Sequence, residues 1–452
     1  MADEARRPSF ALADLAAGQR SLRKVKAKKK RDRSAPAIAA SAADAAERKA
    51  EEDTRREYFF ETGIDRMVEI LGEDLTFPTS SLVIERDEAR FIVDWWWKFC
   101  HNDAAKEARE ASGVAAALPE ELQALASRID ATMEKRGWGG GSGAFVKLST
   151  RSAKDSTIAF DTAAALYKER LQEAEERAAG AVVDLNSRLR LLCEAMGASL
   201  KVESGEEAVL HMLHSERVWE DLTYALSGQL ADDTTAAALP ADADESAAAP
   251  GGTPGGTPGV DVAAVHFRER ISVVVRGWSE LPLWSEFRGF VWGGKLNAVA
   301  QYFHPIRFAE LQPAATRAAI IEDLTAFFDR ELSDKIPLDT YIVDFVWKPD
   351  GTTLLVEVNP FDGVLGSFAA STGLFSWDAD RAILTGVADE EGGDGGGEGG
   401  GAAADAEDVD PRPAFVLRVR EEAKAEAYVK NELRPEWRDV LYLQGNHRQC
   451  HR

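Results

Sequence analysis

Cysteine is scarce in this chain, and long apolar runs are missing from it. Only three cysteines occur among 452 residues, at Cys100, Cys193 and Cys450, and no two of them form a Cys-x-x-Cys pair. This spacing disfavours a disulfide framework and a zinc site, and it is typical of a reducing compartment.

No apolar run approaches the roughly 18 residues that a bilayer span needs. The N-terminus has no basic start followed by an apolar segment, so we predict a soluble, cytoplasmic protein without a secretory signal.

Positive charge is also in short supply. The chain has 54 Lys and Arg against 77 Asp and Glu, which gives a formal net charge of −23. This acidic balance disfavours a general nucleic-acid surface and favours basic partners or simple solubility. The exception is residues 23–33, where eight of eleven are Lys or Arg. That run is typical of a solvated tail, with a nuclear-import signal or an RNA-contacting arm as alternatives. We expect a monomer with no direct nucleic-acid or membrane partner.

Composition divides the chain into one folded unit and several low-complexity segments. Residues 1–56 are rich in Ala, Lys, Arg and Glu and predict a disordered tail. Residues 57–386 predict a single two-lobed domain, interrupted by a flexible insertion at 227–259 that contains the repeat GGTPGGTPG. An acidic, glycine-rich linker at 387–410 leads to a small strand and helix element at 411–452.

Helical periodicity is clear in three stretches. Apolar residues at spacings of three and four after Pro119 predict a helix that ends at the glycine cluster 137–143. That cluster lacks the Gly-Lys-Ser/Thr ending of a Walker motif and precedes a strand. Residues 163–196 predict one long helix, and residues 423–441 predict a helix near the C-terminus.

Three consecutive tryptophans stand at Trp95, Trp96 and Trp97. A helix or a strand cannot turn all three toward one core, so we expect at least one at the surface or in a partner groove. The alternative is that neighbouring segments cover both sides of this element.

Three oxygen-bearing side chains stand in two neighbouring predicted strands. Asp344 is the polar residue of YIVDFV, and Glu357 and Asn359 alternate with valines in LLVEVNPF. Alternate residues of a strand share a face, and a hairpin closed at Asp350-Gly351 sets Asp344 beside the other two. Two carboxylates and an amide oxygen are ligands that Mg²⁺ prefers. The alternative is the polar face of an ordinary hairpin.

Basic side chains interrupt other predicted strands. Arg276, Glu286 and Arg288 lie inside apolar runs between residues 273 and 291, where buried charges need partners, and an anion between the two arginines is a natural one. Lys147 lies in the short strand Phe145–Leu148. Taken alone, it is more typical of a lysine whose ammonium reaches solvent.

The order of these segments resembles the cell division cycle protein 123 family. The resemblance rests on VKLSTRSAKDS at 146–156, HSERVWEDL at 214–222, VVVRGWSELPLWSEFRGFV at 273–291 and YIVDFVWKPDGTTLLVEVNPF at 341–361. These segments and the residues between them cover about half of the chain. The chain departs from the family pattern at Val146 and Thr150, where the family has Pro and Trp, and at Glu357, where Asp is usual.

The resemblance implies an α+β, ATP-grasp-like domain with two lobes and with antiparallel or mixed sheets. It also implies that ATP and Mg²⁺ bind, and that the protein is an assembly chaperone for eukaryotic translation initiation factor 2, acting through its gamma subunit. Seven residues would form the site: Lys147 and Arg288 at the phosphates, Arg276 and Trp278 at the adenine hinge, and Asp344, Glu357 and Asn359 at the metal.

Two other functions fit the same residues. An ATP-grasp ligase or kinase would use the same pocket, but no group of residues identifies a site for an acceptor. A scaffold that has lost ATP is disfavoured by the intact set of Asp344, Glu357 and Asn359.

Overall fold

The structure is a computed structural model that describes residues 54–101, 117–179, 181–236, 267, 271–361, 373–387 and 415–442. Almost all of the predicted tail at 1–56 and of the linker at 387–410 lies outside the described residues, and so does the predicted insertion from residue 237 onward. The first part of that insertion range is helical, because the helix that begins at Glu216 continues to Ala236. Within the described segments, no helix combines the length and apolarity needed to cross a membrane.

A four-stranded antiparallel sheet forms one lobe. Its strands are β1 (Thr79–Val83), β2 (Ala144–Leu148), β3 (Lys201–Val202) and β4 (Ser272–Gly277), in the order β1-β4-β2-β3. Side chains alternate across a strand, so Val146 and Val275 lie on one face while Lys147 and Arg276 lie on the other. The valine face packs in one core with four helices: α4 (Arg86–Phe99), α6 (Gln123–Arg136), α9 (Gly205–Leu213) and α10 (Glu216–Ala236).

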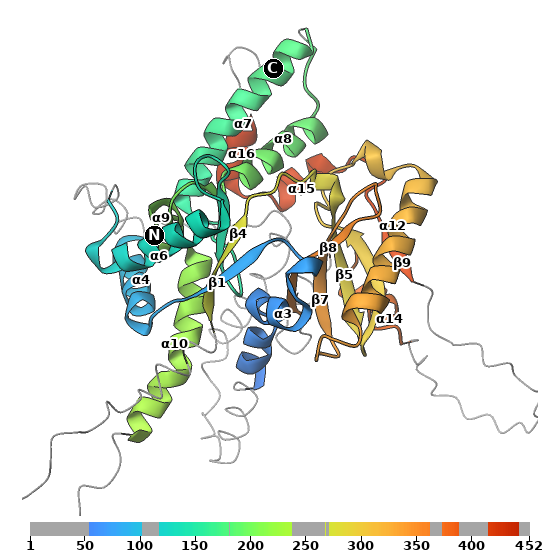
Figure 1. The fold of residues 1–452 in the computed structure, drawn as a ribbon. Helices are drawn as coiled ribbons and strands as arrows, with labels where there is room; N and C mark the ends of the chain where they lie inside the picture. The colour runs from blue at the N-terminus through green and yellow to red at the C-terminus, as the bar shows by residue number, and fades with distance from the viewer. Residues whose placement is uncertain are drawn as a thin grey trace, which may run out of the picture.

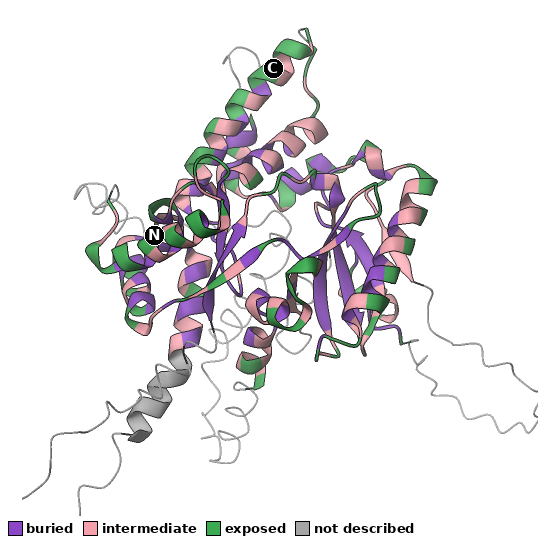
Figure 2. Cartoon of the chain, viewed as in Figure 1, coloured by how far each residue is buried: buried purple, intermediate pink, exposed green. Residues whose placement is uncertain are grey.

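A five-stranded sheet forms the second lobe. It contains β5 (Glu286–Trp292), β6 (Lys295–Gln301), β7 (Tyr341–Trp347), β8 (Thr353–Pro360) and β9 (Val416–Arg418), in the order β8-β7-β5-β6-β9. All neighbours are antiparallel except β6 and β9. Helix α12 (Ala314–Phe327) packs in the core of one face, and α14 (Trp377–Thr385) contacts β5 and β6 in the core of the other (Figure 1). Figure 2 shows that these strands are buried along most of their length.

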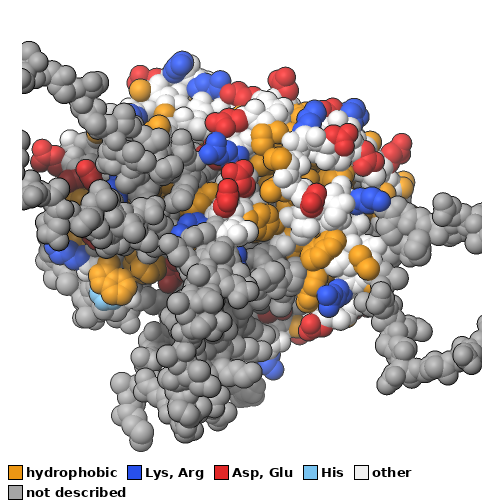
Figure 3. Space-filling view, turned by 90° about the horizontal axis from the view of Figure 1, so that it is seen from below, with side chains coloured by type: hydrophobic (Ala, Val, Ile, Leu, Met, Phe, Trp, Pro, Cys, Tyr) orange, Lys and Arg blue, Asp and Glu red, His pale blue; other side chains and the backbone are white. Residues whose placement is uncertain are grey.

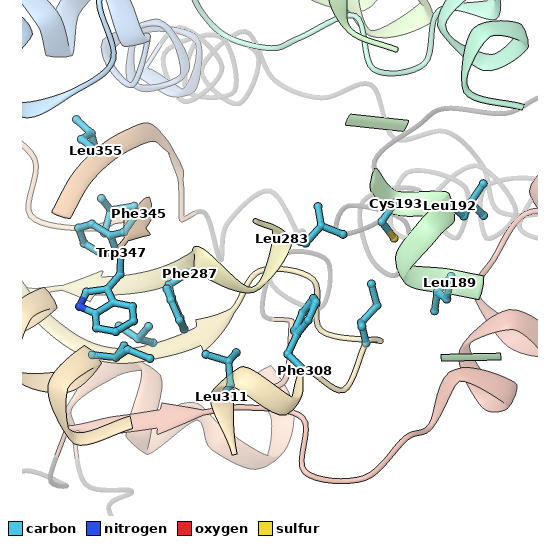
Figure 4. Close-up of a cluster of buried hydrophobic side chains, with 14 of the residues drawn as sticks. Leu189, Leu192, Cys193, Leu283, Phe287, Phe308, Leu311, Phe345, Trp347 and Leu355 are labelled. Atoms are coloured by element: carbon cyan, nitrogen blue, oxygen red, sulfur yellow. The ribbon is translucent and has the colours of Figure 1, made fainter. Parts of the chain in front are cut away.

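A group of helices joins the two lobes. It contains α7 (Thr157–Arg177), α8 (Leu185–Ala198), α15 (Ala425–Asn431) and α16 (Pro435–Tyr442), whose buried side chains share a core with β5 and β7. Figure 4 shows Leu189 and Cys193 of α8 in the cluster that also holds Leu283 and Phe308. Other elements in the described part of the chain include helical residues at 54–61, α3 (Ile64–Leu71), the 3-10 turns Glu73–Leu75, Glu120–Leu122, Leu283–Ser285 and Ala309–Leu311, and a π turn at Phe328–Leu332.

Two predicted helices are each divided in the structure. The predicted helix 163–196 is wrong as a single element, because α7 ends at Arg177 and α8 begins at Leu185, after the N-cap residue Asp184, whose side chain accepts a hydrogen bond from the Ser187 amide. The predicted helix 423–441 is divided between α15 and α16 at Pro435. Proline lacks an amide hydrogen and disfavours helical backbone in the residue before it, so a helix restarts there more easily than it continues.

The predicted α+β class with antiparallel and mixed sheets is confirmed.

The expectation for the tryptophans is also confirmed, because α4 buries Trp95 and Trp96 while Trp97 is 56% exposed. The alternative, in which neighbouring segments cover all three, is wrong.

Candidate nucleotide and metal site

A cavity of about 550 Å³ lies where the polar faces of the two sheets meet. The four-stranded sheet contributes Phe145 and Arg276, and the five-stranded sheet contributes Glu286, Asp344 and Glu357. The strand alternation that buries valines on the outer face of each sheet therefore directs these polar side chains inward. Four predicted site residues line the cavity, namely Arg276, Trp278, Asp344 and Glu357, and the other three contact this group or stand next to it in the strands.

The predicted hairpin forms between β7 and β8, and its register sets Asp344 directly opposite Glu357. The turn closes at Gly351, whose φ of +83° is in the region that favours glycine. Asn359 extends its Nδ2 toward both carboxylates, at 3.3 Å from Asp344 Oδ2 and 3.4 Å from Glu357 Oε1. Asp344, Glu357 and Asn359, which the sequence predicts to lie together, are therefore neighbours.

A β-bulge at Val356 links the hairpin to the other lobe. Phe345 pairs with Leu355 and Asp344 pairs with Glu357, which leaves Val356 as the extra residue of β8. Its carbonyl oxygen accepts a hydrogen bond of 2.8 Å from Arg276 Nη1. The neighbouring Leu355 carbonyl accepts from Thr76 Oγ1 at 2.7 Å. The bulge thus fixes one wall of the cavity against the other.

Lys147 and Glu357 form an ion pair between the two sheets. Lys147 is 1% exposed, so the solvent-exposed alternative is wrong, and its Nζ lies 2.7 Å from Glu357 Oε2. Burial lowers the pKa of Lys147; the Glu357 carboxylate opposes this shift and the charge of Arg276 adds to it. Burial alone would raise the pKa of Glu357, but the charges of Lys147 and Lys154 outweigh it and hold that pKa well below its usual value. Glu357 is therefore an ionised carboxylate at neutral pH.

Arg288 and Asp344 form a second, bidentate pair. The Nε and Nη2 atoms of Arg288 donate to the two carboxylate oxygens of Asp344, each at 2.8 Å. Both side chains are buried, and the guanidinium also lies 4.9 Å from the centre of the Tyr302 ring. The anion beside this arginine is thus the protein's own carboxylate.

Arg276 is held by neutral groups. Besides the Val356 carbonyl, it donates to Thr79 Oγ1 and Thr76 Oγ1, each at 3.1 Å. Burial lowers its pKa to about 10, with Glu357 opposing this shift. Trp278 follows two residues later, after the end of β4, where its amide donates to the Gly143 carbonyl at 3.1 Å. It lies in the connection between β4 of one lobe and β5 of the other.

Further polar residues line the cavity without having been assigned to the site from the sequence, among them Lys154, Glu286 and Tyr302. Lys154 Nζ lies 3.3 Å from the Tyr302 hydroxyl. Lys154 stands in the segment VKLSTRSAKDS that carries the family resemblance, whereas no sequence pattern marks Tyr302. Glu286 does have a signal, because it stands two residues before Arg288 in β5 and shares its face. Burial raises the pKa of Glu286 to about 7; Lys154 opposes the shift, and Asp344 and Glu357 add to it.

The donor atoms fit a hard divalent cation. Asp344 and Glu357 supply carboxylate oxygens, and Asn359 supplies an amide whose Oδ1 would face a cation once the group turns. Among the described residues there is no cluster of three or more His, Cys, Asp or Glu that could hold a metal, and this trio has three ligands only because Asn359 adds its amide to the two carboxylates. Lys147, Lys154 and Arg288 beside it provide the positive charge that a phosphate chain requires.

Comparison of the chain with family profiles identifies its family. The profile of the family described as D123 matches residues 195–432, which is more than half of the chain. The chain belongs to the D123 family. The resemblance recognised in the sequence motifs is thereby confirmed, and six of the seven predicted site residues lie within the matched range. Lys147 is the exception, since β2 precedes that range.

Similar proteins include one curated relative and two solved structures. A protein of Danio rerio named "Translation initiation factor eIF2 assembly protein" is 29% identical over 106 residues, which are 24% of this chain and 28% of the relative. The chain thus spans little more than a quarter of that relative's length. A C-terminally truncated Cdc123 from Schizosaccharomyces pombe gives a TM-score of 0.44 at 13% identity and covers 81% of this chain and 98% of its own. Cdc123 from the same organism gives 0.40 at 15% identity and covers 80% and 97%.

Proposed function

We propose that this D123-family protein binds ATP with Mg²⁺ in the cavity between its two sheets. The observation that carries the proposal is the convergence of two buried ion pairs, Lys147 with Glu357 and Arg288 with Asp344, on one cavity. Proteins bury charges at a cost, and they rarely place several in one cavity without a charged ligand. A metal–polyphosphate complex carries charges of both signs, as this group of side chains does.

Each residue has a role in this proposal. Asp344, Glu357 and Asn359 hold the metal, which when bound neutralises phosphate charge. Lys147 and Arg288 contact phosphate oxygens, and Lys154, which lines the cavity, adds a third cation. Arg276 and Trp278 border the base at the connection between the lobes. The cavity of about 550 Å³ falls within the range usual for small-molecule sites.

We further propose that the chain promotes assembly of translation initiation factor 2, engaging its gamma subunit. Membership of the D123 family and the printed name of the Danio rerio relative support this part of the proposal. In this function ATP orders the two lobes, and the surface around them holds the client. The alternative is an ATP-grasp ligase or kinase.

Calorimetry tests the nucleotide part directly. Titration of the full-length protein with ATP in excess Mg²⁺ should show saturable binding to one site. Absence of binding at millimolar nucleotide would contradict the proposal.

A pull-down from source-cell extract, with and without ATP and Mg²⁺, tests the client. Recovery of a subunit of initiation factor 2 supports the assembly function. ATP binding in calorimetry without that recovery favours the enzyme.

A further inference from the structure

We propose that the site binds metal and nucleotide cooperatively, because each set of ligand-binding residues neutralises the other in the free protein. This inference rests on the proposed function and adds a thermodynamic coupling to it. The metal-binding carboxylates are the counter-ions of the phosphate-binding cations: Glu357 pairs with Lys147, and Asp344 pairs with Arg288.

The two pairs leave little binding capacity for either component alone. Both oxygens of Asp344 accept from Arg288 at 2.8 Å, and Asn359 donates to Asp344 and Glu357 from the side. A divalent cation alone must displace these donors and would leave Lys147 and Arg288 buried without a counter-ion. Such a loss is costly for side chains that are 1% and 6% exposed.

The same argument applies to a nucleotide without metal. Its phosphates would have to separate Lys147 from Glu357 and would then face the Glu357 and Asp344 carboxylates, whose charge repels them. When both components are present, the carboxylates turn to the cation and the cations turn to the phosphates. Every charge then keeps a partner of opposite sign, so the free energies of binding are coupled.

The pairing also makes the two sheets respond together. Lys147 belongs to β2 of one lobe and Glu357 to β8 of the other, so their ion pair crosses the cavity. Exchange of this contact for contacts to the ligand replaces a direct link between the lobes by one that runs through the ligand. Binding of the ligand in the cavity therefore changes the contacts of both lobes.

Removal of the Glu357 carboxylate tests the coupling, because the coupling predicts that the affinity for metal-free ATP rises in the variant. In the wild-type protein, excess Mg²⁺ should strengthen ATP binding at least about fivefold over binding in EDTA, a typical lower bound for coupled sites. In Glu357→Gln, metal-free ATP should bind more tightly than to the wild type, because Lys147 is released and a repelling charge is gone. The factor by which Mg²⁺ strengthens ATP binding should be smaller in this variant than in the wild type. Isothermal titration at pH 7 measures all four affinities.

The mirror variant tests the same contact from the other side. Lys147→Met releases Glu357, so Mn²⁺ without nucleotide, followed by electron paramagnetic resonance, should bind more tightly than to the wild type. Glu88→Gln is the matched control, because it removes the carboxylate of an α4 residue that pairs with Arg128 of α6, and neither residue lines the cavity. It should leave both affinities unchanged.

The outcomes separate this inference from the proposed function. Equal affinity of the wild type for ATP with and without Mg²⁺, or weaker metal-free binding in Glu357→Gln, would overturn the coupling while nucleotide binding stands. A rise in metal-free affinity in Glu88→Gln as large as in Glu357→Gln would also overturn it, because net charge alone would then explain the effect. Absence of ATP binding to the wild type with Mg²⁺ would overturn both.

Discussion

At the scale of single residues, the cavity imposes a cost on one of its own side chains. Burial raises the pKa of Glu286 to about 7 from an ordinary value of 4.5. Because the folded protein then holds this proton more tightly than the unfolded chain, the contribution of Glu286 to stability is greatest below pH 4.5. It is lost as the pH rises through about 7, where the buried carboxyl ionises.

We expect Glu286→Gln to remove this pH dependence. Glutamine resembles the protonated carboxyl, so the variant should match the wild type near pH 4.5 and be more stable at pH 8, by about 1–3 kcal/mol at 1.36 kcal/mol per pKa unit. Urea unfolding of both proteins from pH 4.5 to 8 measures the difference. The control is Glu280→Gln, which removes an exposed carboxylate that lines the same cavity. The difference in the free energy of unfolding between this variant and the wild type should not change with pH. A Glu286→Gln variant with the same pH profile as the wild type would contradict the expectation.

Much of this residue-level arrangement follows from the sequence, and the part that does not has a physical reason. The period of two in a strand places Glu357 beside Asn359, and the turn at Gly351 sets Asp344 opposite. The pairing of Lys147 with Glu357 joins strands 210 positions apart in different sheets, and strand periodicity carries no information about contacts between sheets. The bulge at Val356 is equally invisible, because Leu354, Leu355 and Val356 form an apolar run without a glycine that would mark a bulge.

At the scale of helices and strands, one glycine marks a place where two helices approach closely. Gly205 is the first residue of α9, and its amide donates to Asp130 Oδ1 of α6 at 2.6 Å. A Cβ at this position would lie 2.0 Å from the Ala126 carbonyl oxygen, a backbone atom that cannot rotate away. The contact between α6 and α9 therefore requires glycine.

Gly205→Ala should destabilise the protein by at least about 1–3 kcal/mol, the usual cost of forced overpacking. Gly197→Ala is the matched control, since Gly197 lies within α8 with nothing within 4 Å of the added Cβ. That substitution should be neutral or stabilise by up to about 1 kcal/mol through helix propensity. Chemical denaturation of the two variants decides the matter. Equal losses of stability in both variants would show that the contact with Ala126 does not determine the result.

Element boundaries were harder to predict than element types. The strands around the site and the helix after Pro119 follow from apolar periodicity, and α6 indeed ends at Gly137 in left-handed backbone. Apolar periodicity does not record the break between α7 and α8, whose signals in the sequence are Gly180 and Asp184, residue types that are typical of a helix end and a helix start. The chain turns there so that both helices pack on the same core as Tyr428 and Trp437.

At the scale of the whole molecule, charge is the property most relevant to a partner. The chain carries a net charge of −23. Figure 3 shows one face of the described part, on which acidic and basic side chains are interspersed with hydrophobic ones. The excess negative charge therefore acts on a partner as a long-range field and not as one acidic patch on that face, and such fields affect the rate of encounter more than the contacts made afterwards.

Our last prediction follows from that distinction. If the proposed client is correct, the full-length protein with ATP and Mg²⁺ should bind the gamma subunit of translation initiation factor 2, and added salt should lower the association rate constant more than it raises the dissociation rate constant. Screening shortens the range of charge interactions to about 10 Å at 0.1 M salt, which removes steering but leaves close contacts largely intact. Biosensor kinetics at two salt concentrations measure both rates. Association with no salt dependence would show that the acidic field plays no part in recognition, whereas no association even at low salt would exclude this client and favour an ATP-grasp enzyme.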